Sequence, residues 1–120
     1  MQKKHLKGLG NQGEYQALIY LKDNGLELIE KNFCKQGGQI DLVMYDNLND
    51  EIVFVEVKTR KIGYQRDLVI SQRQAQTILK TAEYWLSKNE KQESQARVDL
   101  VLVEKKEDGY SFNWFKNVIY

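Results

Sequence analysis

The chain has 120 residues, of which 42% are hydrophobic and 29% are charged, and its formal net charge is +1. These proportions are typical of a globular domain and exclude a chain that is disordered throughout. The length predicts a single domain over residues 1–120, with residues 1–9 as a flexible tail. The near-neutral charge excludes the global positive field of a strong non-specific nucleic-acid binder, so any contact with DNA must be local.

Membrane insertion and secretion are not expected. No apolar run approaches the roughly 20 residues that a membrane-spanning helix needs, since the most hydrophobic stretch, residues 52–57, is short and contains Glu56. The basic residues near the N-terminus are not followed by the apolar segment of a secretory signal. Cys34 is the only cysteine, which excludes an internal disulfide and a cysteine-based metal site. We therefore expect a cytoplasmic protein with no membrane partner.

The predicted elements alternate between helical and strand periodicity, with Gly, Asn and Asp marking the turns because the chain contains no proline. Helices are predicted where apolar residues recur three and four positions apart, and strands where short β-branched runs lie between turn residues. In chain order these are a helix over 11–23, strands over 26–33, 40–45 and 52–58, a helix over 71–88, and strands over 98–103 and 110–115. The order α-β-β-β-α-β-β indicates an α/β fold with a mixed β-sheet flanked by helices.

The third predicted strand combines a buried character with charges. Phe54, Glu56 and Lys58 share one face by the period of two, and the valines between them share the other. Apolar residues on both faces indicate a central strand that is covered on both sides. Two charged groups at the end of such a strand are costly unless they have partners or a function.

Asp41, Glu56 and Lys58 form the pattern Asp-x14-Glu-x-Lys on two consecutive strands. A short connection between the strands brings Asp41 beside Glu56, and the alternation of the strand keeps Glu56 and Lys58 on one face. Paired carboxylates suit Mg²⁺ or Mn²⁺, with the remaining positions left to water and a substrate phosphate. A lysine beside them stabilises negative charge, so the trio predicts metal-dependent hydrolysis of a phosphodiester.

The alternative for Glu56 and Lys58 is an exposed ion pair at a strand end, worth about 0–1 kcal/mol, which the apolar context of residues 53–57 argues against. Glu14 borders the apolar stripe of the first helix and is an additional metal ligand, an acceptor for a metal-bound water, or a first-turn acid favoured by the helix dipole. Asp99, inside an apolar run, is expected to be a structural partner for a buried basic or backbone group.

The segment from Glu56 to Lys80 carries six positive and two negative residues and is the predicted phosphate-facing surface. The side chains expected to bind nucleic acid are Arg60, Lys61, Arg66 and Arg73.

Several blocks of the sequence resemble one family of small bacterial proteins. They are Gly10-Asn11-Gln12-Gly13-Glu14, Ile40-Asp41-Leu42-Val43, Val53-Phe54-Val55-Glu56-Val57-Lys58-Thr59-Arg60 and Arg97-Val98-Asp99-Leu100-Val101. In this order they resemble the YraN-like family, from about Gly10 to Tyr120. The resemblance implies a restriction-endonuclease-like fold of the PD-(D/E)xK superfamily, similar to archaeal Holliday-junction resolvases. It also implies a site formed by Glu14, Asp41, Glu56 and Lys58.

Three positions depart from the family pattern. Gln39 stands where the family usually has Glu, so an amide replaces a carboxylate near the site. Gln74 stands where the family tends to have a lysine, with Arg73 beside it as an imperfect substitute. Ile40 replaces the proline of the superfamily's name, a common change. The first two departures weaken the expectation of catalytic turnover more than the expectation of the fold.

The sequence thus predicts a Mg²⁺-dependent endonuclease that cleaves branched or structured DNA during repair or recombination. Because resolving a symmetric junction takes two cuts, a twofold homodimer is an attractive state. One alternative is a non-catalytic nucleic-acid-binding module of the same fold. The other is a scaffold for a DNA-processing protein, which salt-dependent DNA binding would distinguish from the first two.

Overall fold

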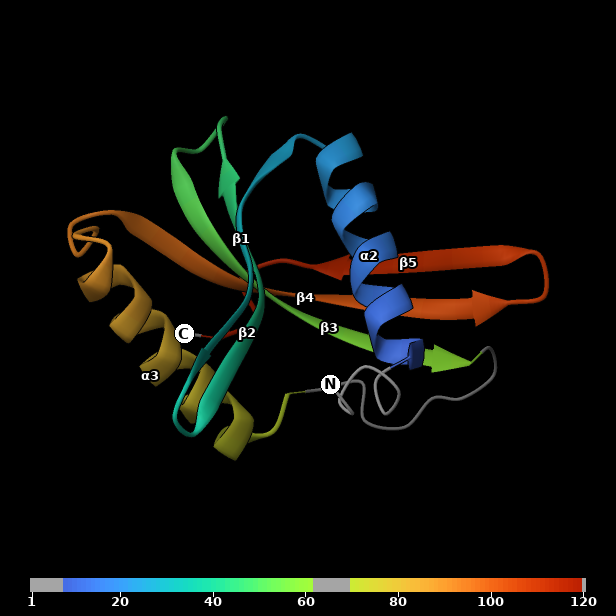
Figure 1. Cartoon of the computed structure of the whole chain (residues 1–120). Helices are drawn as coiled ribbons and strands as arrows, with labels where there is room; N and C mark the ends of the chain where they lie inside the picture. Colours follow the sequence, from blue (N-terminus) through green and yellow to red (C-terminus); the bar gives the residue numbers. More distant parts are fainter. Residues whose placement is uncertain (1–7, 62–69, 120) are drawn as a thin grey trace.

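The structure is a computed structural model that describes residues 8–61 and 70–119. Within these residues, five strands form one sheet that lies between two helices (Figure 1). The helices are α2 (Gly8–Asp23) and α3 (Gln72–Lys88), and the strands are β1 (Leu26–Lys35), β2 (Gly38–Asp46), β3 (Glu51–Lys61), β4 (Gln95–Lys106) and β5 (Gly109–Phe115). The predicted order of elements and the mixed α/β architecture are confirmed.

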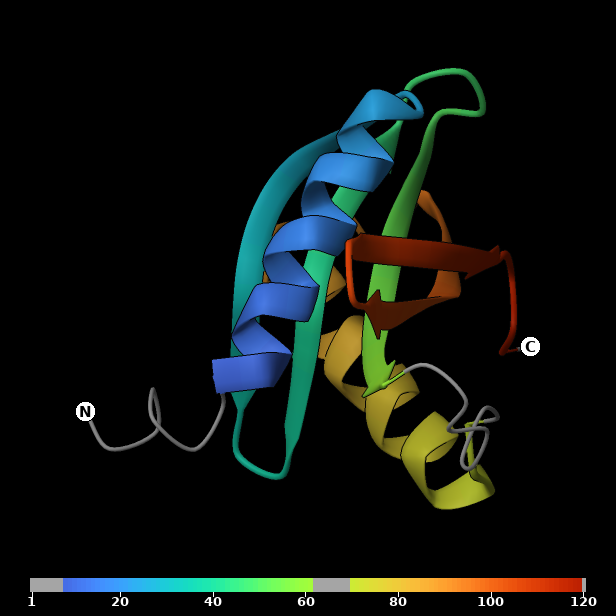
Figure 2. The same ribbon diagram turned by 90° about the vertical axis from the view of Figure 1, so that its right-hand side faces the viewer.

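The sheet has the strand order β1-β2-β3-β4-β5, and β3 is its central strand. Neighbouring strands are antiparallel except β3 and β4, which run parallel. Parallel neighbours need a crossover, which α3 provides. The helices α2 and α3 cover opposite faces of the sheet (Figures 1 and 2). Within the described residues, neither helix is long and apolar enough to cross a membrane.

Each face of the sheet has its own hydrophobic core. Under α2, Leu21 packs against Val55 and its neighbours on the sheet. Under α3, Trp85 packs edge-on against Phe54, with the ring centroids 5.7 Å apart, and Ile78 belongs to the same cluster. Because Phe54 and Val55 alternate between the two cores, β3 is buried on both sides, as the sequence predicts.

Helix α2 begins at Gly8, three residues before the predicted start. Of the flexible tail expected over residues 1–9, residues 1–7 lie outside the described part of the chain. Glycines at positions 8 and 10 make the first turn unfavourable by propensity, which is why the sequence favours a later start. Strands β3 and β4 extend past their predicted ends because they pair in parallel as far as Lys61 with Lys105.

The start of α3 is set by a capping box. Ser71 is the N-cap, and its Oγ accepts a hydrogen bond from the backbone N–H of Gln74 at 3.1 Å. In return, Oε1 of Gln74 accepts from the backbone N–H of Ser71 at 3.4 Å. This reciprocal arrangement satisfies two amides that would otherwise lack partners at a helix start.

Asp99 is fully buried and has the structural role predicted for it. It accepts hydrogen bonds from Arg97 Nε at 3.0 Å and Trp114 Nε1 at 2.9 Å, and also from the backbone N–H of Asn117 at 2.9 Å. Arg97 Nη1 also contacts Asp46 at 3.0 Å and Glu51 at 2.6 Å, near the β2–β3 turn. This buried network joins the turn, β4 and the C-terminal segment.

Candidate active site

Asp41 lies where β2 and β3 separate. Their antiparallel register runs from Asp46 opposite Glu51 to Leu42 opposite Val55, immediately before the position where Asp41 would face Glu56. Beyond this point, Oδ2 of Asp41 accepts a hydrogen bond from the backbone N–H of Val57 at 2.8 Å. The side chain of Asp41 therefore provides the acceptor that a neighbouring strand's carbonyl ordinarily provides.

The alternation of β2 also breaks at Asp41. Leu42 packs in the core under α2, whereas Ile40, two residues earlier, packs in the core under α3. Residues two apart on a regular strand point to the same face, so the strand twists out of register between Ile40 and Leu42. This local irregularity directs the buried Asp41 side chain toward β3.

Glu56 occupies the next position on β3 and has a strongly perturbed carboxyl group. The pKa of Glu56 is raised from its ordinary 4.5 to about 7, chiefly by burial and next by the negative charge of Asp41. Lys58 opposes this shift, while Glu14 and a side-chain hydrogen bond with Asp41 add to it. Residues of α2, β2 and β3 therefore act on one carboxyl group, as expected of a single site.

Gln39 and Glu14 border the two central carboxyl groups. Nε2 of Gln39 donates a hydrogen bond to Oδ1 of Asp41 at 3.2 Å. Glu14 is partly buried and lines a small pocket of about 200 Å³ with Lys31 and Asn32 of β1. The two β1 residues carry no motif and do not stand out in the sequence, because only the packing of α2 beside β1 brings them to Glu14.

The donor set at Asp41 and Glu56 fits a hard divalent cation. Two adjacent carboxyl groups supply oxygen ligands, and Mg²⁺ is commonly held by one or two carboxylates with water and phosphate completing its coordination. Across residues 8–61 and 70–119, no three His, Cys, Asp or Glu side chains are grouped so that they could hold a metal ion together. A role for Glu14 as a third ligand stays a prediction.

Two of the basic residues predicted to contact nucleic acid, Arg60 and Lys61, are the last two residues of β3. Lys61 is exposed, and Arg60 is half-buried and donates a hydrogen bond to the carbonyl oxygen of Thr59 at 2.8 Å. Arg73 is exposed in the first turn of α3, and Arg66 lies outside the described residues. Gln74 uses its side chain in the N-cap of α3, so its place near the site stays a prediction.

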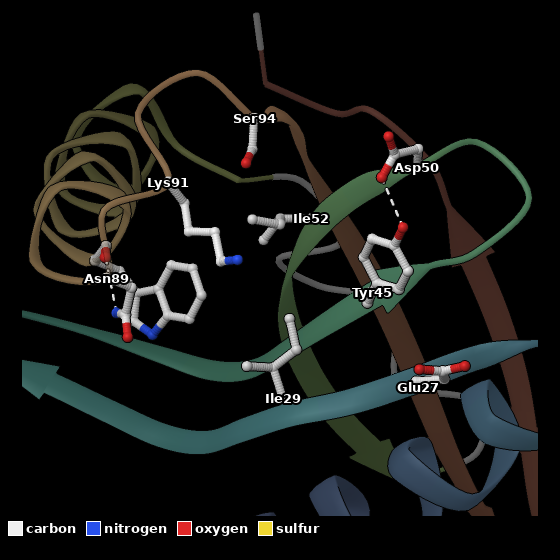
Figure 3. Close-up of a pocket in the computed structure, with 9 residues that line it drawn as sticks. Glu27, Ile29, Tyr45, Asp50, Ile52, Asn89, Lys91 and Ser94 are labelled. Atoms are coloured by element: carbon white, nitrogen blue, oxygen red, sulfur yellow. Dashed lines mark hydrogen bonds between the residues drawn. The ribbon is translucent and has the colours of Figure 1, made fainter.

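A larger pocket lies elsewhere, near the β2–β3 turn (Figure 3). It has a volume of about 490 Å³, and Tyr45, Trp85 and Lys91 are among its lining residues. Lys91 points into it, and Tyr45 donates a hydrogen bond to Asp50 on its far side (Figure 3). None of the four predicted catalytic residues lines this pocket, so pocket size does not identify the candidate site.

Gly13 allows α2 to approach β3 beside the candidate site. A Cβ atom at Gly13 would collide with Oγ1 of Thr59 and would lie 3.0 Å from Cβ of Thr59. Gly38 has a similar role on the other face, where an added Cβ would collide with Oγ1 of Thr81 on α3. The absence of side chains at these two glycines therefore allows the two helices to lie close to the strands that carry Asp41 and Glu56.

We expect Gly13→Ala to destabilise the fold, although alanine normally stabilises a helix by about 1 kcal/mol relative to glycine. Overpacking against Thr59 costs about 1–3 kcal/mol, which outweighs that gain. Urea unfolding of Gly13→Ala, of Thr59→Ala and of the double variant measures the effect. The double variant should recover part of the loss, because Thr59→Ala removes the colliding oxygen. Equal or greater stability of Gly13→Ala would show that α2 does not depend on this close approach.

The chain forms a mixed sheet with helices on both faces, and the second and third strands carry an Asp, a Glu and a Lys. This is the architecture of the restriction-endonuclease-like class of α/β proteins. The family described as "Uncharacterised protein family UPF0102" matches residues 13–103. The chain belongs to this family, which confirms the YraN-like assignment made from the sequence motifs.

Relatives of this family match most or nearly all of the chain. A UPF0102 protein of Geobacter metallireducens is 38% identical over 101 residues, which cover 82% of this chain and 81% of the relative. One from Trichlorobacter lovleyi is 39% identical over 99 residues, covering 81% and 77% of the two chains. One from Aliivibrio salmonicida is 37% identical over 127 residues, covering 99% and 98%. The chain and these relatives thus share most of their lengths.

Proposed function

We propose that this protein is a Mg²⁺- or Mn²⁺-dependent endonuclease that cleaves phosphodiester bonds in branched or structured DNA. The observation that carries the proposal is the convergence of Asp41, Glu56 and Lys58, in which burial and the Asp41 charge raise the pKa of Glu56 to about 7. Two adjacent acids in this state repel each other when ionised, and a divalent cation relieves the repulsion.

Each residue of the site would have a different role in hydrolysis. Asp41 and Glu56 would hold the cation, which when bound supplies a polarised phosphate and a more acidic water. Glu56 must release its proton to become a ligand, so cation binding is coupled to pH. Lys58 places a positive charge beside the two acids, where negative charge grows on the scissile phosphate. Arg60 and Lys61 extend this positive charge to the neighbouring phosphates.

A non-catalytic DNA-binding module is the second candidate function. It is favoured by Gln39, whose amide stands where the family usually has a carboxylate, and by the lack of a three-acid group in the described part of the chain. Such a protein would keep the basic surface and bind DNA without cleaving it.

The proposed function is tested by incubating the purified protein with a four-way junction, a flap and single-stranded DNA in Mg²⁺, in Mn²⁺ and in EDTA. We expect cleavage of at least one branched substrate in either metal and none in EDTA. Salt-dependent binding without cleavage of any substrate would favour the non-catalytic module. A protein that does not bind any of these substrates would favour the scaffold alternative.

A further inference from the structure

A row of basic and aromatic side chains lies along the exposed face of α3. Arg73, Lys80, Tyr84 and Lys88, here called the α3 ridge, are separated by seven, four and four positions and therefore share one face of the helix. Tyr84 is 45% exposed, and the three basic residues are exposed. At 1.5 Å per residue the ridge is about 22 Å long.

The positive charge of the α3 ridge is not offset within the helix. Glu83 is the only acidic residue between positions 72 and 88, and it lines an apolar groove with Leu79 and Leu86 on another side of α3. Two neutral residues, Thr77 and Ser87, lie between or beside the ridge residues. The charges of α3 are thus segregated, whereas an ordinary solvated helix face usually mixes both signs.

Strand β1 contributes a further lysine, Lys35, beside the α3 ridge, and aromatic rings hold Lys35 and Lys88 in place. The ammonium of Lys35 lies over the ring of Tyr84, 5.2 Å from its centroid, and that of Lys88 lies 5.5 Å from the centroid of Phe33. The rings of Phe33 and Tyr84 stack with centroids 6.2 Å apart. These cation–π contacts hold flexible lysine side chains in place, which reduces the entropy that a partner must remove on binding.

The α3 ridge also lies close to the candidate active site. Thr77 and Thr81 of α3 pack against Gly38 of β2, and the next residue of β2, Gln39, donates a hydrogen bond to Asp41. A polyanion that follows the ridge would therefore pass beside the strand that carries Asp41.

We propose that the α3 ridge, with Lys35, binds the phosphate backbone of a duplex arm of the DNA substrate. The seven- and eight-residue intervals between Arg73, Lys80 and Lys88 correspond to about 10.5 and 12 Å along the helix. These intervals are close to the width of about 12 Å of the DNA major groove, so a helix that crosses the groove meets phosphates of both strands. This inference rests on the proposed function, because it identifies a second contact surface for the same DNA.

The test is the salt dependence of binding to a fluorescently labelled four-way junction in EDTA, measured by fluorescence anisotropy. Lys80→Ala with Lys88→Ala should weaken binding by about 10- to 50-fold near physiological salt. The slope of log affinity against log salt should fall by up to about 1.8, since each phosphate contact contributes about 0.9. The thermal midpoint should fall by only a few degrees, because both side chains are exposed and the contact of Lys88 with Phe33 is weak at an exposed position.

Lys116→Ala is the matched control. Lys116 also lies over an aromatic ring, with its ammonium 4.4 Å from the centroid of Trp114, but Trp114 packs with the core under α2. We expect its binding and salt slope to equal those of the wild type.

The outcomes separate this inference from the proposed function. Equal binding by the Lys80/Lys88 double variant and by Lys116→Ala would overturn the proposal that the α3 ridge binds DNA, even if the wild type cleaves DNA. Weaker binding with a lower salt slope would support the ridge, even if no cleavage is found. A wild-type protein that binds none of the junction, flap and single-stranded substrates would overturn both.

Discussion

Asp41→Asn is expected to lower Mg²⁺-dependent cleavage of branched DNA by at least about 100-fold while leaving DNA binding intact or tighter. The substitution removes one of the two carboxylates proposed to hold the cation. It nearly preserves shape, because the amide oxygen can still accept from the N–H of Val57, and Gln39 can turn its own amide to remain hydrogen-bonded. Removing a negative charge beside bound phosphates favours binding.

Cleavage rates and anisotropy titrations with the same junction measure the two effects separately. Asp23→Asn is the matched control, since Asp23 is an exposed aspartate at the end of α2. It should cleave and bind as the wild type does. Wild-type cleavage by Asp41→Asn would remove Asp41 from the catalytic site, and weaker DNA binding by the folded variant would contradict the placement of Asp41 beside the bound phosphates.

Glu56→Gln is expected to stabilise the protein at pH 8 by about 1–3 kcal/mol in the absence of metal. In the folded protein the pKa of Glu56 is about 7, against an ordinary 4.5, because of burial, the charge of Asp41 and, to a lesser extent, Glu14, with Lys58 opposing them. Between these two pKa values the folded state binds more protons than the unfolded state, so stability falls as pH rises. A glutamine is neutral at every pH and avoids this loss.

Urea unfolding in EDTA at pH 5 and pH 8 measures the difference. The wild type should lose more stability than Glu56→Gln between these two pH values, whereas Glu83→Gln, at an exposed position of α3, should follow the wild type. Added Mg²⁺ should stabilise the wild type at pH 8 more than it stabilises Glu56→Gln. A Glu56→Gln variant that is less stable than the wild type at pH 8 would contradict the electrostatic account of this site.

The central trio was predictable because its members are close in sequence. Asp41 and Glu56 belong to neighbouring strands joined by a short turn, and the period of two keeps Glu56 and Lys58 on one face. The break in β2 at Asp41 was not predictable, because the residues 40–42 have an ordinary strand pattern. It depends on the hydrogen bond from Val57, which forms only once the two strands have separated.

Contacts between distant elements also could not be predicted from the sequence. Gly13 and Thr59 meet only because α2 crosses β3, and the motif alone does not identify the residue that demands a glycine. The contact of Lys35 with Tyr84 depends on how α3 is rotated above β1. Asp99 could be predicted as a buried partner from its apolar neighbours, but the convergence of Arg97 on Asp46 and Glu51 required the tertiary structure.

The hydrogen bonds of Asp41 have a consequence for the entropy of ligand binding. Oδ2 is held by the backbone of Val57 and Oδ1 by the amide of Gln39, so both oxygens of this carboxylate are oriented by the fold. An unrestrained side chain would lose rotamer freedom on meeting a cation, at a cost of up to about 1–2 kcal/mol. For Asp41 that loss has already occurred when the chain folds. The amide at position 39 therefore helps to orient the Asp41 carboxylate, which an ionised carboxylate there could not do by donating a hydrogen bond.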